Sequence, residues 1–406
     1  MPEIRRLETE ELLQLRKIHT IVYNQRKDYS KEENQKLDPY EHPADWAWGF
    51  FDGKKLLAGM FEVDYLMRFD GHSVKMSGIS GVGTLPEMRK GGLVRQIFGK
   101  LLPEAYEKGV VFSNLTPFSH DFYRKFGYEI TCVRNSITIS TGDLSEIRMK
   151  GEFTHILPGD DTSLLAEVHS AYIENINHGI HRDYWPDNRA WKIFTKDDPY
   201  TTGTYLYLWK DENGKASSYI KYHDVVEDGD HNMSVYELAF INKKGLYGAL
   251  SIAGGLSAQF QNFKWLMPAF IDPFDFTGDA WSVETELKPR DMTRIINVKT
   301  ALELMRRPHG EGEYIIKVTD DNISANSGKY LVQFGAEGAK VSVTSKNEDL
   351  SCDILTLSQL VTGYRSLENA MYSRSTPESA ALEVIKNEET LKRVFTLRPQ
   401  HVTEYF

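Results

Sequence analysis

The feature that most constrains the fold is a strand, a glycine-bearing loop and a helix that follow one another early in the chain. Alternating apolar residues predict a strand over residues 74–84, and Gly91 and Gly92 then form a flexible loop. Apolar residues next recur at every fourth position from Leu93 to Leu101, and again one position later. This spacing predicts a helix that buries a broad face.

Antiparallel strands are expected around this unit. Residues 46–51 and 55–65 have strand-like patterns before it, and residues 110–115 follow it. Short connections make the early strands antiparallel neighbours. A helix that begins after Thr9, its expected N-cap, precedes them. The order of elements is therefore helix, antiparallel strands, helix and strand.

A weaker copy of this order appears later in the chain. It comprises a strand over 234–241, a glycine-containing turn over 242–250, a helix over 250–260 and a strand over 263–267. Aligning Gly92 with Gly245 puts Asn242 where Arg89 stands, so the second copy lacks the basic residue at this position. The similarity predicts an internal duplication. The alternative is coincidence between two common strand–turn–helix units.

The pattern changes again from Asp291 onward. The expected elements are a helix over 292–305, strands over 314–318, 329–334 and 340–344, and helices over 355–362 and 378–392. At 406 residues the chain is too long for one ordinary core. We expect three domains, at residues 1–145, 146–287 and 288–406, in an α+β fold.

Charge and cysteine content narrow the function classes. The chain has 58 acidic and 48 basic residues, a net charge of −10, which argues against a nucleic-acid binder because phosphate neutralisation needs a basic face. An acidic surface attracts cationic small molecules or lysine-bearing chains, and acidity that serves solubility alone explains the balance equally well. Two distant cysteines, Cys132 and Cys352, and twelve scattered histidines predict neither a disulfide framework nor a metal site.

No segment of the sequence has the composition of a membrane anchor. The N-terminus begins with charged residues and continues into an amphipathic helix. No stretch approaches the roughly 20 consecutive apolar residues of a membrane span. We therefore expect a cytoplasmic protein without a membrane partner.

The loop from Arg89 to Arg95 is the first candidate site. A loop at a helix N-terminus exposes unpaired backbone N–H groups, and the helix dipole favours an anion there. Glycines let the backbone approach that anion, and Arg89, Lys90 and Arg95 add positive charge. A pyrophosphate is the ligand that this arrangement suits best, although many Gly-Gly segments that enter a helix are only turns.

The context of the loop adds a family resemblance. The loop follows an antiparallel meander instead of a first βαβ unit, which disfavours a dinucleotide site. It also lacks the Gly-Lys-Ser/Thr ending of a P-loop. The pattern Arg-x-x-Gly-x-small, placed after a strand and opening a helix, resembles the pyrophosphate loop of the GNAT acetyltransferases. In that superfamily the preceding strand, here Val82-Gly83-Thr84, pairs with the pantetheine arm. Val94 departs from the pattern, because many GNAT enzymes have Gly or Ala there.

A tyrosine after the next strand is the second candidate. Tyr123 lies in PFSHDFYRKFGYE, in a turn of helix before Phe126. A phenol with a pKa of about 10 can donate a proton to a departing CoA thiolate. His120 is a rival acid or base, and Tyr128 is expected to be a packing residue. Most of the 21 tyrosines must be packing residues as well.

The chain end, HVTEYF, is the third candidate. A terminal carboxylate is usually frayed in solvent. If the rings of Tyr405 and Phe406 were buried, the carboxylate of Phe406 would be fixed where it could attract and deprotonate an ammonium group.

Together these features resemble one family over the whole chain, the Eis (enhanced intracellular survival) acetyltransferases. The resemblance rests on VGTLPEMRKGGLVR and FYRKFGYE at their mutual spacing, and on the second, degenerate GNAT-like domain. A sterol carrier protein-like third domain and an aromatic final residue complete it. The expected fold is thus two tandem GNAT-like domains followed by a sterol carrier protein-like domain.

The resemblance implies roles for individual residues. Tyr123 would be the general acid that reprotonates the CoA thiolate, and the carboxylate of Phe406 would be the general base on the amine. Acetyl-CoA would be held by Val82, Gly83, Thr84, Arg89, Lys90, Gly91, Gly92, Leu93, Val94, Arg95, Phe118 and Ser119. Transfer would be direct, with no acyl-enzyme and no metal. The family also implies a homohexamer.

Three functions remain open on the sequence. The first is acetylation of an aminoglycoside-like or polyamine-like small amine. The second is acetylation of protein lysines or N-termini, which shares the catalytic residues and differs only in the cleft. The third is a non-catalytic acyl-CoA- or lipid-binding protein that depends on the third domain.

Overall fold

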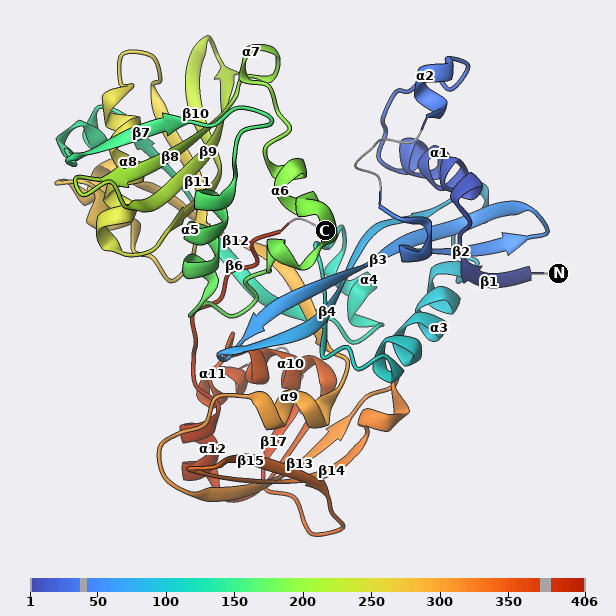
Figure 1. Ribbon diagram of the computed structural model, residues 1–406. Helices are drawn as coiled ribbons and strands as arrows, with labels where there is room; N and C mark the ends of the chain where they lie inside the picture. The colour runs from blue at the N-terminus through green and yellow to red at the C-terminus, as the bar shows by residue number, and fades with distance from the viewer. Residues whose placement is uncertain (1, 37–41, 373–380, 405–406) are drawn as a thin grey trace. The chain divides into compact units, whose positions relative to one another are not determined.

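The computed structural model describes residues 2–36, 42–372 and 381–404, which divide into two compact units. The first unit holds the described residues up to Thr131, those of Asp291–Arg398, and Glu404. The second unit holds Cys132–Arg290 and Pro399–Thr403. Figure 1 labels the helices and strands of both.

The N-terminal part of the first unit is built on a mostly antiparallel sheet (Figure 1). Its strands are β1 (Pro2–Arg6), β2 (Ala47–Asp52), β3 (Lys55–Phe69), β4 (His72–Thr84), β5 (Phe112–Leu115) and the last residues of β12 (Glu284–Ile295). They lie in the order β1-β2-β3-β4-β5-β12, and only β4 and β5 are parallel neighbours. The predicted antiparallel strands before the helix are therefore confirmed, and the structure adds a parallel pair, β4 and β5.

Two helices cover opposite faces of this sheet. On one face, α3 (Leu93–Glu107) packs its predicted apolar stripe against side chains of β2, β3 and β4. On the other face α1 (Leu12–Val22) lies so close that two strand positions must be glycine. A Cβ on Gly59 would lie 2.8 Å from Leu15 Cδ1, and one on Gly83 would lie 2.8 Å from Ile18 Cγ2. The remaining helices here are α2 (Glu32–Gln35) and α4 (His120–Arg124).

The predicted N-cap at Thr9 is wrong. Thr9 belongs to a 3-10 turn, Thr9–Glu11, that precedes α1. Glu8 stands before this turn, and the Glu11 carboxylate accepts the Glu8 amide at 2.8 Å. Arg5 donates to the same carboxylate at 2.7 Å, so a charge pair fixes the helix start instead of a hydroxyl cap.

The C-terminal part of the first unit is a five-stranded sheet with helices packed on it (Figure 1). Its elements are α9 (Val298–Leu304), β13 (Gly312–Thr319), β14 (Gly328–Gly335), β15 (Gly338–Val343), β16 (Leu350–Asp353), α10 (Ile354–Thr362), α11 (Leu367–Ala370), β17 (Leu382–Val384) and α12 (Glu388–Val394). The strand order is β15-β14-β13-β16-β17, with β13 and β16 parallel. The three predicted strands at 314–344 are confirmed.

Two predicted helices in this region are wrong in part. Residues 292–295 belong to β12 and pair with β5, and the helix begins only after Asn297, whose side chain accepts the Thr300 amide at 3.0 Å. In the described part of 378–392, residues Leu382–Val384 form β17, paired with β16, and α12 starts at Glu388.

The second unit repeats the topology of the first sheet. Its elements are β6 (Glu129–Ser140), β7 (Gly151–His155), α5 (Ser163–Ile173), α6 (Arg189–Phe194), α7 (Pro199–Thr202), β8 (Thr204–Asp211), β9 (Ala216–Glu227), β10 (Asp230–Phe240), α8 (Lys243–Gly255) and β11 (Asn262–Pro268). The strand order is β6-β11-β10-β9-β8-β7. The parallel pair β10 and β11, joined by α8, corresponds to β4 and β5 joined by α3. The tandem arrangement of two GNAT-like sheets is confirmed.

The second copy differs from the first in the connection before its helix. The predicted turn over 242–250 is wrong, because α8 begins at Lys243 and only two residues separate it from β10. Eight residues, 85–92, separate β4 from α3. Gly245 is therefore a helix residue, and a Cβ there would collide with the Ser217 carbonyl oxygen. The second copy has lost the whole loop as well as its arginine.

One negative finding concerns membranes. Within the described residues, every helix is too short or too polar to cross a lipid bilayer.

Candidate active site

An open strand edge lies beside the parallel pair of the first sheet. β4 pairs with β5 only over Met76–Ile79, and on this side residues 80–84 have no partner strand among the described residues. A bulge at Gly81, with φ of +59°, interrupts the pairing of β4 with β3. An unpaired edge of this kind can pair with an extended ligand that carries amide groups.

His19, on α1, holds the bulge in place. Its Nε2 lies 2.5 Å from the Gly81 carbonyl oxygen. A Cβ on Gly81 would lie 2.7 Å from the His19 ring, so only glycine fits the bulge. Burial lowers the pKa of His19 to about 4, although the hydrogen bond to Gly81 opposes this shift. His19 is therefore neutral near pH 7 and donates through Nε2.

The N-terminus of α3 presents uncapped backbone amides. Gly92 is the N-cap, with φ of +73°, and it has no side chain to accept a hydrogen bond. The helical hydrogen bonds begin with the Gln96 amide, which donates to the Gly92 carbonyl at 3.1 Å. Among the described residues, the amides of Leu93, Val94 and Arg95 have no partner. Three free donors at the positive end of a helix suit an anionic group.

Three cations surround these amides. Arg89, Lys90 and Arg95 are exposed, and none of them forms an ion pair with a described residue. Lys90 takes a left-handed conformation, with φ of +68°, so the loop turns sharply without a glycine at this position. In a chain of net charge −10, this local positive charge favours a phosphate-bearing ligand.

These features meet in one cavity of about 750 Å³. Of the predicted acetyl-CoA residues, the lining contains Val82, Gly83, Thr84, Arg89, Lys90, Gly92, Leu93, Val94, Arg95 and Phe118. It does not contain Gly91 or Ser119. Ser119 instead caps α4, where its Oγ accepts the Phe122 amide at 3.4 Å.

Sequence reasoning missed the other residues of the lining. They are Val22, Tyr23, Met88, Phe122, Lys125 and Phe126. Tyr23 follows α1, and its hydroxyl donates to the Val82 carbonyl oxygen at 3.5 Å. No local signal distinguishes such a tyrosine from a packing residue. Phe122 and Phe126, in contrast, flank the predicted acid at helical spacing and could have been included.

Tyr123 lies on α4 beside this cavity. Its side chain is 3% exposed, and the Phe118 ring, which lines the cavity, is 5.3 Å away. Burial is the main cause that raises the pKa of Tyr123 above its usual value, and the nearby Tyr23 and Tyr128 add to the shift. The phenol therefore stays protonated at neutral pH. Among the described residues its hydroxyl has no hydrogen-bond partner.

The two neighbouring candidates of the sequence differ from Tyr123. Tyr128 is fully buried and its hydroxyl lies 2.7 Å from Ser113 Oγ, as expected for a packing residue. His120 is half-buried at the first turn of α4.

The predicted base, Phe406, lies outside the described residues. Of the tail before it, Pro399–Thr403 is described and belongs to the second unit. The His401 amide donates to the Asn177 carbonyl at 3.0 Å, and Thr403 Oγ1 accepts the Ile180 amide at 3.0 Å. Val402 is fully buried. Residues 401–403 are thus anchored in the second unit.

Family profiles match two parts of the chain. The acetyltransferase (GNAT) domain profile matches residues 3–131, which hold the open β4 edge, the α3 loop and Tyr123. The sterol carrier protein domain profile matches residues 298–400. No curated protein sequence matches the chain.

Solved structures share the fold over the whole length. A GCN5-related N-acetyltransferase from Anabaena variabilis has 19% identity and a TM-score of 0.84, with 100% of both chains covered. One from Kribbella flavida has 17% identity and a TM-score of 0.79, with 100% of this chain and 98% of the other covered. Eis1 from Mycobacterium abscessus has 16% identity and a TM-score of 0.78, with 100% of both chains covered. The chain therefore carries an acetyltransferase domain of the GNAT family and a sterol carrier protein domain, in the fold of Eis1.

Proposed function

We propose that this acyltransferase moves the acetyl group of acetyl-CoA onto the amine of a cationic acceptor. One observation carries the proposal. The cavity of about 750 Å³ joins an unpaired strand edge to uncapped helix amides and three unpaired cations. The amides of pantetheine can pair with the strand edge, and the negative charge of pyrophosphate suits the helix amides and the cations.

Different residues of the cavity bind different parts of acetyl-CoA. In this proposal, Val82, Gly83 and Thr84 pair with the pantetheine arm. The α3 loop, residues 89–95, binds the pyrophosphate. Phe118 closes the opening near the thioester, since its ring is exposed and lies against Tyr123. Gly91 supports the loop from outside the lining, and Ser119 acts by capping α4.

The chemical step is direct transfer. The amine nitrogen attacks the thioester carbon, the C–N bond forms, and the C–S bond breaks as the thiolate leaves. Tyr123 protonates that thiolate, and the carboxylate of Phe406 removes the proton from the attacking amine. An acyl-enzyme is not needed: both cysteines are buried, and burial raises the pKa of Cys352 above its usual value.

The acceptor is proposed as an aminoglycoside-like or polyamine-like amine, in keeping with the net charge of −10. Protein lysines and N-termini are the alternative acceptors, which use the same residues. We also propose that the protein acts in the cytoplasm as a homohexamer.

A lipid-binding role for the third domain has less support. The cavity inside its sheet-and-helix layer measures about 10 Å³ and is lined by Leu302, Tyr314, Phe334 and Val394 among others. A pocket for a drug-sized apolar ligand measures roughly 300 Å³ or more. This cavity, formed by described residues, is too small for an acyl chain or a sterol, which favours a structural role for the domain.

The test compares Tyr123→Phe, and a chain that lacks Phe406, with Tyr128→Phe. CoA release would be followed with a thiol reagent, using kanamycin-type amines, spermidine and a lysine peptide as acceptors. Loss of the acid or the base should lower kcat by about tenfold or more and leave the KM for acetyl-CoA nearly unchanged. Tyr128→Phe removes a buried hydroxyl from the same cluster and should keep kcat.

Two results would count against the proposal. Full kcat in Tyr123→Phe would remove the acid role of this residue. CoA release no faster than acetyl-CoA hydrolysis with every acceptor would remove the amine-transfer reaction itself.

A further inference from the structure

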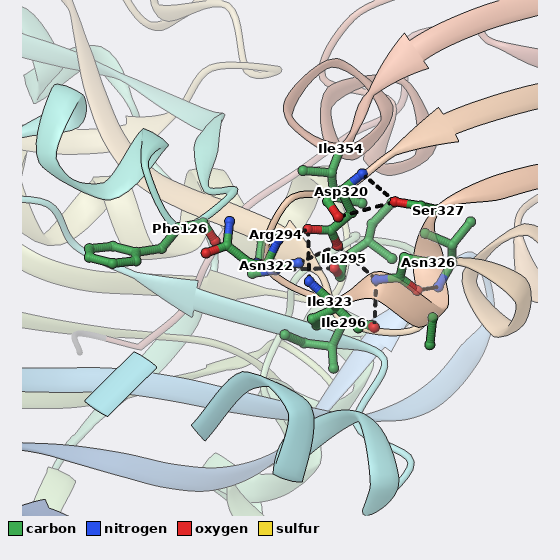
Figure 2. Close-up of polar contacts among 12 residues, drawn as sticks. Phe126, Arg294, Ile295, Ile296, Asp320, Asn322, Ile323, Asn326, Ser327 and Ile354 are labelled. Carbon is green, nitrogen blue, oxygen red and sulfur yellow. Dashed lines mark hydrogen bonds and ion pairs between the residues drawn. The ribbon is translucent and has the colours of Figure 1, made fainter. Parts of the chain in front are cut away.

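A fully buried ion pair lies next to the turn that follows α4. Arg294, near the end of β12, donates from Nη2 to Oδ2 of Asp320 at 2.5 Å, and neither side chain is exposed. Asp320 follows β13, so it belongs to the part of the chain that matches the sterol carrier protein domain. Figure 2 shows this pair at the centre of a polar network.

The carboxylate of Asp320 is held in place by its own loop. It accepts Asn326 Nδ2 at 2.9 Å and the backbone amides of Asn322 and Ile323 at 3.0 and 3.2 Å (Figure 2). Asn326 is anchored in turn, because its Nδ2 also donates to the Ile296 carbonyl at 3.0 Å. Asp320 therefore offers the guanidinium a fixed partner.

The other side of Arg294 points to the turn after α4. Its Nη1 donates to the Phe126 carbonyl oxygen at 2.5 Å (Figure 2), and Asn322 Nδ2 donates to the Lys125 carbonyl oxygen at 3.3 Å. Two consecutive carbonyls of this turn are thus bound by groups of the 320–326 loop and its arginine. A Cβ on Gly127 would lie 2.9 Å from Nη1, so this glycine makes room for the guanidinium.

The turn is bonded directly to Tyr123. The Tyr123 carbonyl accepts the amides of Phe126 and Tyr128, at 2.9 and 3.3 Å. Lys125 and Phe126 also line the cavity. A shift of the two bound carbonyls would therefore move the phenol relative to the cavity.

Stability alone does not explain this pair. Removing two charges from water is costly, and apolar residues of similar volume often stabilise a fold as well or better. Burial lowers the pKa of Arg294, which reflects that cost. The ion pair instead fixes the orientation of the groups around it. A planar guanidinium can bind a carboxylate and a carbonyl at fixed angles at the same time.

We propose that Arg294, held by Asp320, is a positioning residue that sets the place of Tyr123 beside the cavity. The sterol carrier-like domain then supports catalysis through its 320–326 loop. This inference rests on the proposed role of Tyr123 as the general acid.

The test replaces both charges together, as Arg294→Met with Asp320→Asn. Arg294→Met alone would leave a buried carboxylate without its partner and could prevent folding. The double variant should fold, lower kcat by about tenfold, and change the KM for acetyl-CoA by less than about threefold. Arg294→Lys keeps the charge but lacks the planar guanidinium that binds both partners at fixed angles, so it should recover stability without recovering kcat.

The second unit offers a matched control. Arg182 and Glu237 form a comparable pair that is also buried, with Nη2 and Oε2 2.6 Å apart. Arg182→Met with Glu237→Gln should lower Tm by a similar amount and leave kcat unchanged. If both double variants lose kcat equally, the loss is a general effect of destabilisation and the inference is wrong.

A double-mutant cycle separates this inference from the proposed function. If the pair acts through Tyr123, replacing it in a Tyr123→Phe background should cause no further loss of kcat. If the two losses multiply, the positioning role is wrong and the acid role stands. If Tyr123→Phe alone keeps full kcat, both are wrong.

Discussion

His19 is a single residue on which the shape of the candidate site depends. Its side chain crosses from α1 to the β4 bulge and donates to Gly81, and its imidazole is neutral because burial lowers its pKa to about 4. Protonation would leave a charge in a buried place, and water stabilises that charge better in the unfolded chain. The stability of the structure around the bulge should therefore depend on pH through His19.

The prediction is a loss of stability in acid that depends on His19. Between pH 6.5 and pH 4 the unfolded chain binds a proton at this residue and the folded chain does not, so the free energy of unfolding falls as the pH falls. The difference in pKa corresponds to roughly 3 kcal/mol at most. His19→Gln keeps a donor for Gly81 and cannot titrate, so its stability should decline less over this range.

Urea unfolding at several pH values between 7 and 4 would measure the effect. His72→Gln, at an exposed position, is the control and should follow the wild-type curve. Parallel curves for His19→Gln and wild type would show that the folded protein does not exclude a proton at His19.

The site residues that the sequence predicts lie close together along the chain. The site residues that it misses lie far along the chain from the strand they contact. The loop residues from Arg89 to Arg95 stand together in one motif, and Tyr123 follows at a spacing that the family resemblance specifies. His19 lies on α1 and Tyr23 directly after it, about sixty residues before the strand that they contact. Only the packing of a helix across the sheet brings them there, and no local pattern encodes that contact.

At the scale of elements, α3 and α8 form a natural comparison. They are corresponding helices of the two copies, and each has a pair of consecutive basic residues near its N-terminus, Arg89 and Lys90 in one and Lys243 and Lys244 in the other. Only α8 is capped by a side chain, that of Asn242, which accepts the Gly245 amide at 2.9 Å. A side chain therefore caps an amide at the N-terminus of α8, whereas the first amides of α3 have no capping side chain in the described part of the chain.

This difference predicts opposite results for the same charge change. Replacing Arg89 and Lys90 by alanine should raise the KM for acetyl-CoA by about tenfold at low salt, because two cations near the proposed pyrophosphate are lost. The same change at Lys243 and Lys244 should have little effect. Steady-state kinetics at about 0.02 M and 0.3 M NaCl would check this, since screening should shrink the first effect. Equal effects at both helices would contradict a phosphate site at α3.

Elements were predictable where they are amphipathic and not where they are buried on both faces. The helix α3 and the strands β13 to β15 each show one apolar face, and the sequence pattern finds them. Met292 and Ile295 at the end of β12, and Ile296 directly after it, are fully buried. The spacing of these apolar residues fits a helical period, and α9 follows shortly after them. The sequence pattern therefore predicts one helix over 292–305. A central strand and a helix segment cannot be distinguished by period alone.

At the scale of the whole molecule, the sheets depend on pairings between distant segments. β6 follows the first copy in the chain and pairs with β11, whereas β12 follows the second copy and pairs with β5. Local propensity does not specify such an exchange of strands. The resemblance predicted the tandem fold as a whole, because a family preserves such pairings without encoding them in any short motif.

The net charge of −10 also belongs to this scale. A negative field over the molecule attracts a polycation from a distance, and salt weakens that attraction once charges are farther apart than about 10 Å. For the proposed amine acceptors, kcat/KM should therefore fall by about tenfold for a polyamine when NaCl rises from about 0.02 M to 0.3 M. A neutral arylamine should show little change.

The measurement must hold acetyl-CoA at saturation at each salt concentration, because the basic α3 loop should make its own KM depend on salt in the same direction. Under that condition the ratio of kcat/KM for the polyamine to kcat/KM for the arylamine reports only the electrostatic attraction of the cationic amine. A ratio that stays constant would mean that the acidic balance serves solubility alone. A ratio that falls with salt would mean that the field of the whole chain selects cationic acceptors before any side chain of the cavity contacts them.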